Sequence, residues 1–388
     1  MTGAMRTPVR ILHAHSTFSL GGKEARAVRL MNAFGDTAQH TILSAMPGAL
    51  GARAAIDPAI AVDFPADAPS LRGRPGFRRY VALADYMRGF DLVLTYNWGA
   101  MDAVMAHRLF RGTRGLPPLV HHEDGFNEDE SVARNWKRNA FRRLALKTAS
   151  ALVVPSQTLE RIAAREWRAA MRTQLIRNGI AVADYAGEPT VAIPGLATTD
   201  GDVVIGTVAG LRKVKNLPAL VSAAAPLRTQ ARLVIVGEGP ERSTIAARAI
   251  ACGWGDRCIL PGFMAKPHRW IGHFDILGLS SLSEQAPIAV IEAMAAGLPV
   301  ASLDVGDVAA MVAPENLPFI VSDAAALRKA LEQLAADAAL RRSVGEANRR
   351  RAHELFEERD MIAAYVTLYG RLLGDATRLD ATRSGVRA

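Results

Sequence analysis

The sequence predicts an α/β protein with two Rossmann-like domains, each a doubly wound parallel sheet, that face each other across a cleft. Short apolar segments of strand length alternate with helical segments along nearly all of the 388 residues. Glycine-containing or polar turns follow many of the apolar segments, as they do where strands pass into helices. One tract rich in Pro, Gly and Thr, residues 186–201, interrupts this alternation and predicts a linker between two domains.

This linker and the change of pattern toward the C-terminus suggest domain boundaries. We expect a first domain over residues 1–185, a second over residues 202–355, a long amphipathic helix over residues 356–374 and a disordered polar tail over residues 375–388.

Composition places the chain among soluble globular proteins. Apolar residues make up 49% and charged residues 22% of the sequence, and its apolar runs are too short and interrupted to span a bilayer. The first residues enter a strand directly, so we expect no signal peptide. The only cysteines, Cys252 and Cys258, imply no disulfide framework, and a reducing cytoplasm fits them.

The net charge of +9 is unevenly distributed. Residues 1–185 contain 25 Lys and Arg and 16 Asp and Glu, a difference of +9, whereas the remainder has 22 of each. A basic half favours an anionic partner, namely a lipid phosphate, a membrane surface or an acidic glycan. Nucleic acid is not expected, because no zinc-finger, helix-turn-helix or RNA-recognition signature accompanies the charge. A general bias toward arginine is the alternative explanation.

The stretch from Asp275 to Met311 organises the rest of the chain. It predicts a strand over 275–279, a polar turn, a helix over 288–296 that Gly297 ends, and a second strand. Glu284 precedes this helix and Glu292 lies inside it. A helix N-terminus attracts phosphate, and two carboxylates beside it could accept hydrogen bonds from sugar hydroxyls.

The pattern S-E-x-x-P-x-x-x-x-E-A-M-A-x-G-x-P-V in this stretch resembles the donor-binding motif of retaining GT-B glycosyltransferases of family 4. The resemblance implies that Glu284 holds the donor sugar and Glu292 the ribose. It also implies that the helix start at Ala286, Pro287 and Ile288 binds the donor diphosphate. The family usually has Gly and an aromatic or small residue where Gln285 and Ala286 stand, so the donor sugar stays open.

Two cations predict the rest of the diphosphate site. Arg212 and Lys215 lie in a turn between a strand and a helix, where cations and N–H groups bind phosphates. The family commonly has an arginine five residues before this lysine, where Gly210 stands here, and Arg212 is its substitute. By the same resemblance, Gly262 and Phe263 edge the nucleobase pocket. The alternative is that both cations are simply solvated.

The first half contributes a glycine pair and a histidine. Gly21 and Gly22 follow the first strand in the form G-G-x-E, which resembles the family loop that faces the donor diphosphate and acceptor. Residues 119–121 predict a strand, at whose end the family places a histidine close to the donor sugar. We carry that role onto His121, with His122 as the alternative. A structural histidine is a competing interpretation. A metal site formed with the next two acids, Glu123 and Asp124, is disfavoured, because adjacent residues of an extended chain point in opposite directions.

Residues 134–147 predict a basic helix with six cations and no acid. Its cations include the predicted acceptor or membrane contacts Arg134, Lys137, Arg138, Arg142 and Arg143. Its apolar residues Trp136, Ala140, Phe141, Leu144 and Ala145 can share one face. Such a helix lies on an anionic membrane, or packs this face on the sheet and leaves its cations in water.

Together these features predict a retaining glycosyltransferase that moves a sugar from a UDP- or GDP-sugar to a hydroxyl of a lipid-linked or polysaccharide acceptor. The resemblance further implies that helix 356–374 packs back on the first domain. We expect no metal and no separate cofactor, and a location in the cytoplasm or on the inner face of the cytoplasmic membrane. A non-catalytic sugar-nucleotide-binding partner protein is an alternative. An NAD-dependent oxidoreductase is disfavoured, since no G-x-G-x-x-G is present.

Overall fold

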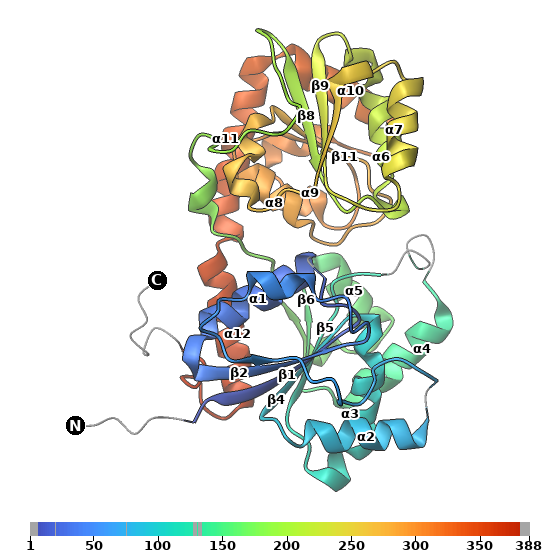
Figure 1. Ribbon diagram of the computed structural model, residues 1–388, viewed down its shortest axis with the longest axis vertical. Coiled ribbons are helices and arrows are strands. Elements are labelled where there is room, and N and C mark those ends of the chain that lie inside the picture. Colours follow the sequence, from blue (N-terminus) through green and yellow to red (C-terminus); the bar gives the residue numbers. More distant parts are fainter. Residues whose placement is uncertain (1–6, 20, 75, 127–129, 131–133, 381–388) are drawn as a thin grey trace, which may run out of the picture. The chain divides into compact units, whose positions relative to one another are not determined.

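The computed structural model describes residues 7–19, 21–74, 76–126, 130 and 134–380 (Figure 1). Its contacts divide the chain into a first unit, Met1–Arg177 with Asp360–Ala388, and a second unit, Asn178–Arg359. Within the described residues, no helix combines the length and apolarity that crossing a membrane requires.

The first unit is a seven-stranded parallel sheet in the order β3-β2-β1-β4-β5-β6-β7. Its strands are β1 Val9–His15, β2 Ala38–Ser44, β3 Val62–Asp63, β4 Leu92–Tyr96, β5 Leu119–His122, β6 Ala151–Val154 and β7 Thr173–Leu175. Its helices are α1 Gly22–Phe34, α2 Phe77–Met87, α3 Met101–Arg114, α4 Trp136–Ala145, α5 Gln157–Arg165 and most of α12 Glu358–Leu372.

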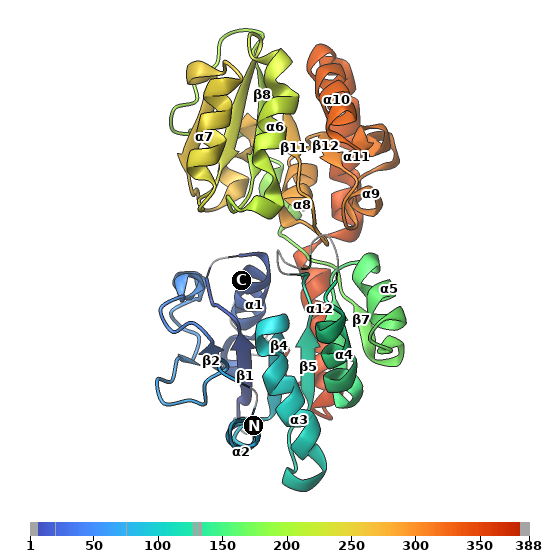
Figure 2. The ribbon, with the colours of Figure 1, turned by 90° about the vertical axis from the view of Figure 1, so that its right-hand side faces the viewer.

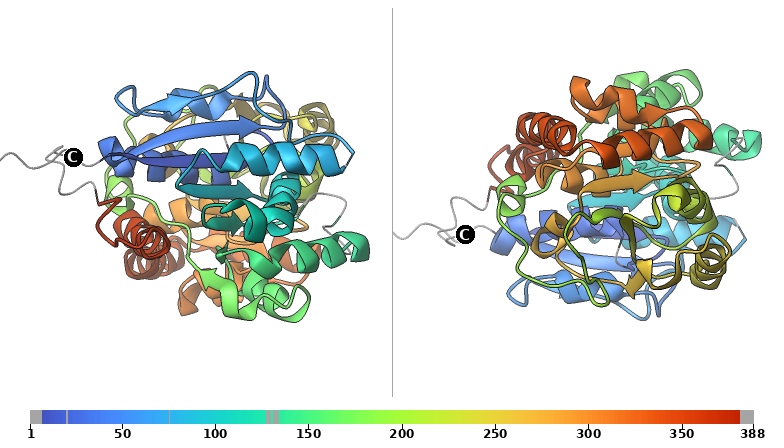
Figure 3. Two further views of the ribbon diagram at one scale, coloured as in Figure 1. Left: turned by 90° about the horizontal axis from the view of Figure 1, so that it is seen from below. Right: turned by 90° about the horizontal axis from the view of Figure 1, so that it is seen from above.

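Helices cover this sheet on both faces, and successive strand residues alternate between the two layers. In β5, Leu119 packs into the cluster that contains α2 and α3, whereas Val120 packs into the cluster that contains α1 and α12. Figure 3 allows α3 and α12 to be followed on the two faces. Most strand residues therefore face one helix layer or the other, and the polar side chains of the predicted sites lie at or just beyond the strand ends.

The second unit is a six-stranded parallel sheet in the order β10-β9-β8-β11-β12-β13 (Figure 2). Its strands are β8 Val203–Val208, β9 Ala231–Val236, β10 Cys258–Gly262, β11 Ile276–Leu279, β12 Val300–Leu303 and β13 Ile320–Val321. Its helices are α6 Leu217–Ala224, α7 Arg242–Ala251, α8 Ile288–Ala295, α9 Val308–Met311, α10 Ala324–Ala336 and α11 Ala338–Leu355. Both units thus confirm the predicted doubly wound parallel sheets.

The segment before the second sheet differs from the expected linker. Ile180, Val182, Tyr185 and Ile193 are buried in the core beside α8, and Ile180 exchanges hydrogen bonds with the chain near α12. Residues 178–201 therefore pack as part of the second unit, because their apolar side chains complete one face of its sheet. Sequence patterning missed this because the segment forms no regular helix or strand that a period could reveal.

The tail that follows α12 also differs from expectation, whereas α12 itself does not. Helix α12 places Met361, Tyr365, Leu368 and Tyr369 in the core of the first unit. The expected disordered tail begins at Asp375, yet the Asp375 N–H donates to the Gly370 carbonyl at 3.0 Å and Leu379 is fully buried. An apolar anchor thus orders residues 375–380; the rest of that predicted tail, residues 381–388, lies outside the described residues.

One glycine contact tests how α11 packs against the turn after α8. Gly345 of α11 approaches Gly297 so closely that a Cβ on Gly345 would lie 1.9 Å from the Gly297 carbonyl oxygen. We expect Gly345→Ala to lower the free energy of unfolding by about 1–3 kcal/mol, because the helix must move outward. Denaturant unfolding measures this change.

Gly112 of α3 is the matched control, because a Cβ there meets no atom within 4 Å. Gly112→Ala is expected to raise stability by about 0.5–1 kcal/mol through helix propensity. Equal effects of the two substitutions would contradict the packing of α11 described here.

Candidate functional site

The second sheet reverses its strand order between β8 and β11. From β8 the chain proceeds to β9 and β10 on one side, and then returns to add β11, β12 and β13 on the other. Ligands of open α/β sheets bind in the crevice at the carboxyl ends of the strands where such a reversal occurs. The loops after β8 and β11 carry the predicted donor residues Lys215 and Glu284.

Lys215 and Glu284 are in direct contact. The Lys215 Nζ lies 2.5 Å from the Glu284 Oε1, and the Ser281 hydroxyl donates to the same oxygen at 2.7 Å. The Ser280 hydroxyl donates to the Asn216 carbonyl at 2.9 Å, which ties the loop after β11 to the start of α6. The structure therefore brings two predicted residues, 69 positions apart, into one ion pair.

Arg212 lies in the same loop and is exposed. Its Nε lies 3.7 Å from where a Cβ on Gly210 would stand. The guanidinium thus folds back over the glycine, so that an arginine at 212 fills space beside position 210.

Glu292 lies within α8 and is buried, with 6% of its surface exposed. The Tyr185 hydroxyl donates to its Oε1 at 3.2 Å. At the start of the same helix, the Asn178 side-chain amide donates to the Ala286 carbonyl at 3.0 Å. Asn178 and Tyr185 are site residues that the sequence did not predict. The turn dipeptide Asn178-Gly179 is a sequence signal for Asn178, whereas Tyr185 carries none.

Gly306, in the loop after β12, packs against the backbone of the turn at residues 284–286. A Cβ on Gly306 would lie 2.5 Å from the Glu284 carbonyl oxygen, and the φ of Gly306 is +60°. The neighbouring Asp307 N–H donates to the Gln285 carbonyl at 2.8 Å. Only glycine allows this approach, so the loop after β12 sets the position of the predicted donor residues before Pro287.

Of the predicted nucleobase residues, Gly262 is the last residue of β10 and Phe263 follows it. Gly262 has a φ of +90° and its carbonyl accepts a hydrogen bond from the Gly237 N–H at 2.9 Å. Phe263 is exposed over 58% of its surface. An exposed aromatic ring at a strand end is available to stack on a flat ligand.

The glycine pair of the first unit lies where predicted, before α1. Gly21 is the N-cap of α1, and a Cβ there would lie 2.9 Å from the Glu24 Oε2. Lys23 forms an ion pair with Glu24, whose pKa is raised by burial. A carboxylate of the chain itself therefore lies beside the glycine at which an anion was predicted to bind.

Four consecutive polar residues, the last two of β5 and the two that follow it, point alternately to the two helix layers. His121 and Glu123 face α4, where the Glu123 Oε2 accepts from the Arg142 Nε at 3.2 Å. His122 and Asp124 face α1 and α12: the His122 Nε2 lies 2.8 Å from the Tyr369 hydroxyl, and Asp124 binds Arg26 through both carboxylate oxygens. Burial alone raises the pKa of Asp124, but the Arg26 guanidinium outweighs it and holds that pKa below its usual range.

His121 is wholly buried in the first unit. Its Nδ1 lies 2.8 Å from the Thr95 hydroxyl, and its Nε2 lies 3.8 Å from the Glu123 Oε2. Among the described residues, its Nε2 has no hydrogen-bond partner, and neither has the Glu123 Oε1. Across all the residues that the structure describes, no three His, Cys, Asp or Glu side chains gather as a metal-binding group.

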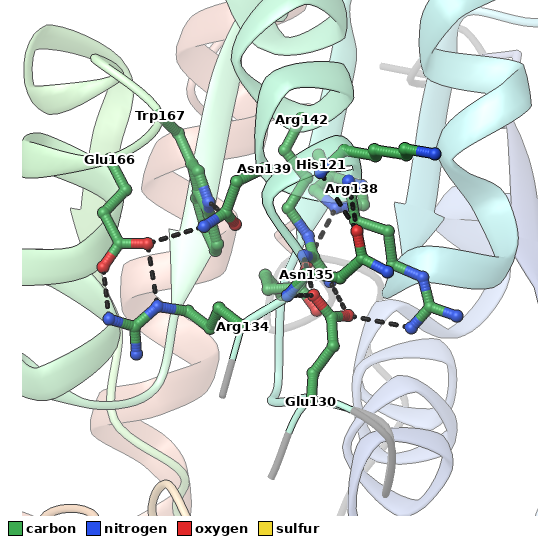
Figure 4. Close-up of polar contacts among 11 residues, drawn as sticks. His121, Glu130, Arg134, Asn135, Arg138, Asn139, Arg142, Glu166 and Trp167 are labelled. Atoms are coloured by element: carbon green, nitrogen blue, oxygen red, sulfur yellow. Dashed lines mark hydrogen bonds and ion pairs between the residues drawn. The ribbon is translucent and has the colours of Figure 1, made fainter. Parts of the chain in front are cut away.

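The basic helix does not hold all its cations in water (Figure 4). Arg142 has no exposed surface, and its Nη1 and Nη2 donate to Glu130 at 3.0 and 3.1 Å. Arg138 also donates to Glu130, at 3.0 Å, and Arg134 forms an ion pair with Glu166 at 2.5 Å. Arginine hydrogen bonds outweigh the effect of burial and hold the pKa of Glu130 below its usual value.

The predicted apolar face of this helix is only partly buried: Ala145 is fully buried and Phe141 is half-buried. Trp136 is 72% exposed and Leu144 is 44% exposed, whereas Arg142 occupies the buried face. Its guanidinium lies 5.0–5.4 Å from the ring centres of Trp98, Phe126 and Trp167. A guanidinium stacked between aromatic rings and paired with carboxylates can be buried, so apolar spacing alone did not predict the burial of Arg142.

Part of the second unit matches a known protein family. Residues 193–351 match the family described as "Glycosyl transferases group 1". N-acetyl-alpha-D-glucosaminyl L-malate synthase of Bacillus anthracis is 27% identical over 181 residues, which cover 46% of this chain and 48% of that protein. 2-Deoxystreptamine glucosyltransferase of Streptomyces kanamyceticus is 28% identical over 177 residues, covering 43% and 46%. The matches span about half the length of these curated relatives.

Solved structures show the same fold over nearly the whole chain. Anabaena HepE, solved in complex with UDP, aligns with a TM-score of 0.75 at 17% identity and covers 93% of this chain and 100% of its own. WaaG, a glycosyltransferase involved in lipopolysaccharide biosynthesis, aligns with a TM-score of 0.64 at 16% identity and covers 95% and 99%. The fold is therefore GT-B, as the motif resemblance predicted.

The buried histidines of the first unit predict a pH dependence of its stability. The His13 Nε2 lies 3.0 Å from the His40 Nδ1, and burial lowers the pKa of His40 to about 4 and that of His122 to about 3. An unfolded histidine takes up a proton near pH 6.5, whereas these remain neutral in the folded unit. Stability is therefore expected to fall as the pH drops from about 7 toward 4.

A single variant isolates one of these histidines. Between pH 7.5 and 5, His40 alone is expected to account for a loss of about 2 kcal/mol in the free energy of unfolding, and His40→Gln removes that loss. His353→Gln, at an exposed position of the second unit, is the control. Denaturant unfolding at both pH values measures the slopes, and identical slopes for wild type and His40→Gln would refute the prediction.

Proposed function

We propose that this chain, whose residues 193–351 match the glycosyltransferase group 1 family, transfers a sugar from a nucleotide diphosphate donor to an acceptor hydroxyl, with retention at the anomeric carbon. The observation that carries the proposal is the convergence of Lys215, Ser281 and Glu284 at the strand-order reversal of the second sheet. The E-x7-E motif then extends from this point into α8, where Glu292 is buried beside Tyr185.

The cations act on the leaving group. When the bond to the sugar breaks, negative charge develops on the diphosphate, and preorganised donors near it lower the barrier. The ammonium of Lys215 has three N–H donors, so it can hold Glu284 and a phosphate oxygen together. Arg212, folded over Gly210, supplies a second cation, and the backbone at Pro287 and Ile288 supplies the positive end of α8.

The two carboxylates act on hydroxyls. Glu292 accepts hydrogen bonds from the ribose. The Tyr185 hydroxyl, which donates to the Glu292 Oε1, fixes the orientation of this carboxylate. Glu284, oriented by Lys215 and Ser281, accepts from the donor sugar and stabilises positive charge on the ring in the transition state. Phe263 and the backbone at Gly262 bind the base.

The assignment of His121 to the donor sugar stays a proposal. Its Nε2 is enclosed in the first unit, so contact with a sugar requires that nitrogen to become exposed. His122 is a weaker candidate, since both its ring nitrogens lie near hydrogen-bonding oxygens, those of Thr95 and Tyr369.

The donor class is a UDP- or GDP-sugar, and UDP-sugars are the first to test, because HepE binds UDP and UDP-glucose. We further propose an acceptor that is lipid-linked or a polysaccharide. This fits the basic first half of the chain, and WaaG has a named role in lipopolysaccharide biosynthesis.

Donor binding is tested by thermal shift and isothermal titration with UDP-, GDP- and ADP-sugars and with NADH. We expect one nucleotide-sugar group to stabilise the wild type. Lys215→Ala should weaken its binding by about ten- to a hundredfold, the effect of losing a charge-assisted hydrogen bond. Glu292→Gln should weaken it similarly.

Lys213→Ala is the matched control, because Lys213 lies exposed in the same turn two residues away. An equal loss in this variant would mean that general charge, and not the site, binds the donor. Stabilisation by NADH alone would overturn the proposal. Donor binding without hydrolysis or transfer of the sugar would instead identify a non-catalytic binding protein.

We also propose that the first unit contacts an anionic membrane through the outer face of α4, which suits a location on the inner face of the cytoplasmic membrane. Trp136 and Leu144 are exposed there, and Lys137 and Lys147 flank them. Arg142 is excluded from this surface by its burial. Apolar side chains among cations are what anionic interfaces bind.

Vesicle co-sedimentation tests this surface. The double variant Trp136→Ser and Leu144→Ser should bind vesicles that contain phosphatidylglycerol at least fivefold more weakly than wild type, since both apolar contacts are lost. Leu317→Ser is the control, because Leu317 is equally exposed, at 44%, but lies in the second unit. Unchanged binding of the double variant would exclude α4 as the contact.

A further inference from the structure

A pocket of about 320 Å³ opens in the first unit, beside the carboxyl end of β4. It is lined by Trp98, Gly99, Met101, Asp102, Lys137, Arg138 and Phe141. This volume lies at the lower end of the range for small-molecule sites, about 300–1,000 Å³, and suits one or two sugar rings. No residue predicted to bind the donor lines it.

The turn that presents Trp98 is strained. Asn97 has a φ of +55°, and its side-chain oxygen accepts a hydrogen bond from the Asp124 N–H at 2.7 Å. Gly99 lies so close to Ser16 that a Cβ there would approach the Ser16 Cβ to 2.2 Å. Strained backbone at the strand-order reversal between β1 and β4 is typical of ligand sites in open α/β sheets.

The walls of the pocket combine aromatic and charged groups. Trp98 and Phe141 meet edge to face with ring centres 5.7 Å apart, and Met101 is buried beside them. Asp102 accepts from the Arg79 Nη1 at 2.7 Å and from the Tyr80 hydroxyl at 3.2 Å, so its carboxylate is both oriented and neutralised. It retains lone pairs that can accept a ligand hydroxyl.

The two cations of the pocket, Arg138 and Lys137, differ in whether a carboxylate pairs with them. Arg138 lies 5.1 Å from the Trp98 ring centre and is paired with Glu130. Lys137 lies 5.8 Å from the exposed Trp136 ring, and no described carboxylate is within ion-pair distance of its Nζ. The pocket therefore offers an aromatic wall, a hydroxyl acceptor and one lysine with spare positive charge.

We propose that this pocket binds an anionic hexose, a sugar with a carboxylate or phosphate group, as the acceptor unit. The apolar C–H face of the ring packs on Trp98 and Phe141, a hydroxyl donates to Asp102, and the anionic group pairs with Lys137. The inference rests on the proposed function only in calling this sugar the acceptor. The pocket's preference for a negative charge is a separate property.

Ligand-observed NMR titration of the full chain with glucuronate, glucose 6-phosphate and glucose tests this preference, with no nucleotide present. We expect one of the anions to bind about two- to fivefold more tightly than glucose, the factor that one partly exposed lysine supports. The better of the two anions distinguishes a carboxylate from a phosphate.

Lys137→Glu should abolish this preference, whereas Lys147→Glu, at an exposed lysine outside the pocket, should retain it. Fluorotryptophan spectra then locate the ligand among the five tryptophans: the Trp98 resonance should shift, and those of Trp254 and Trp270 in the second unit should not. Both lysine positions are exposed, so neither variant threatens folding.

Three results would overturn the proposal: equal binding of glucose and the anions, equal effects of the two lysine variants, or an unmoved Trp98 resonance. Failure of the donor test with intact anion preference would refute the proposed function and leave the pocket standing. If the protein transfers sugar to neutral acceptors and the pocket shows no preference for anions, the proposed function stands and the pocket proposal is refuted.

Discussion

Burial of both sheet faces under helices is the constraint on which the rest of this structure depends. Most strand residues enter one helix layer or the other, and successive residues enter opposite layers. Apart from buried groups such as the pair of His13 and His40, polar groups gather at strand ends, and the most open of these ends lie where the strand order reverses. The ion pair of Lys215 and Glu284, and the pocket beside Trp98, both occupy such positions.

The same constraint divides the residues that follow β5. Alternation sends His121 and Glu123 to α4 and sends His122 and Asp124 to α1 and α12, so the four cannot converge on one ion. Each layer then compensates its buried carboxylate with its own arginine, Arg142 on one side and Arg26 on the other. Removing either arginine would leave a buried charge without its partner, which costs several kcal/mol.

The donor site is the part of the chemistry that the sequence predicted. The E-x7-E motif and the turn around Lys215 predicted one donor site, because a helix start, cations and carboxylates each have a local signature. Asn178 and Tyr185 contact the residues of that predicted site across 108 and 107 positions of the chain, and Gly306 contacts it from another loop, so none of the three carries a local signature that would have predicted this contact. The roles of all these residues in catalysis are still proposals.

Sequence by itself determined the fold class, the two parallel sheets and the position of the donor motif, because apolar period and turn chemistry are local. Only the tertiary structure decided which face of α4 is buried: apolar spacing grouped Trp136 and Leu144 with Ala145, whereas the structure exposes the first two and buries Arg142 against Glu123, Glu130 and three aromatic rings. It likewise decided that residues 178–201 belong to the second unit. Burying a charge or an irregular segment depends on partners distant in the chain, and no periodic pattern records them.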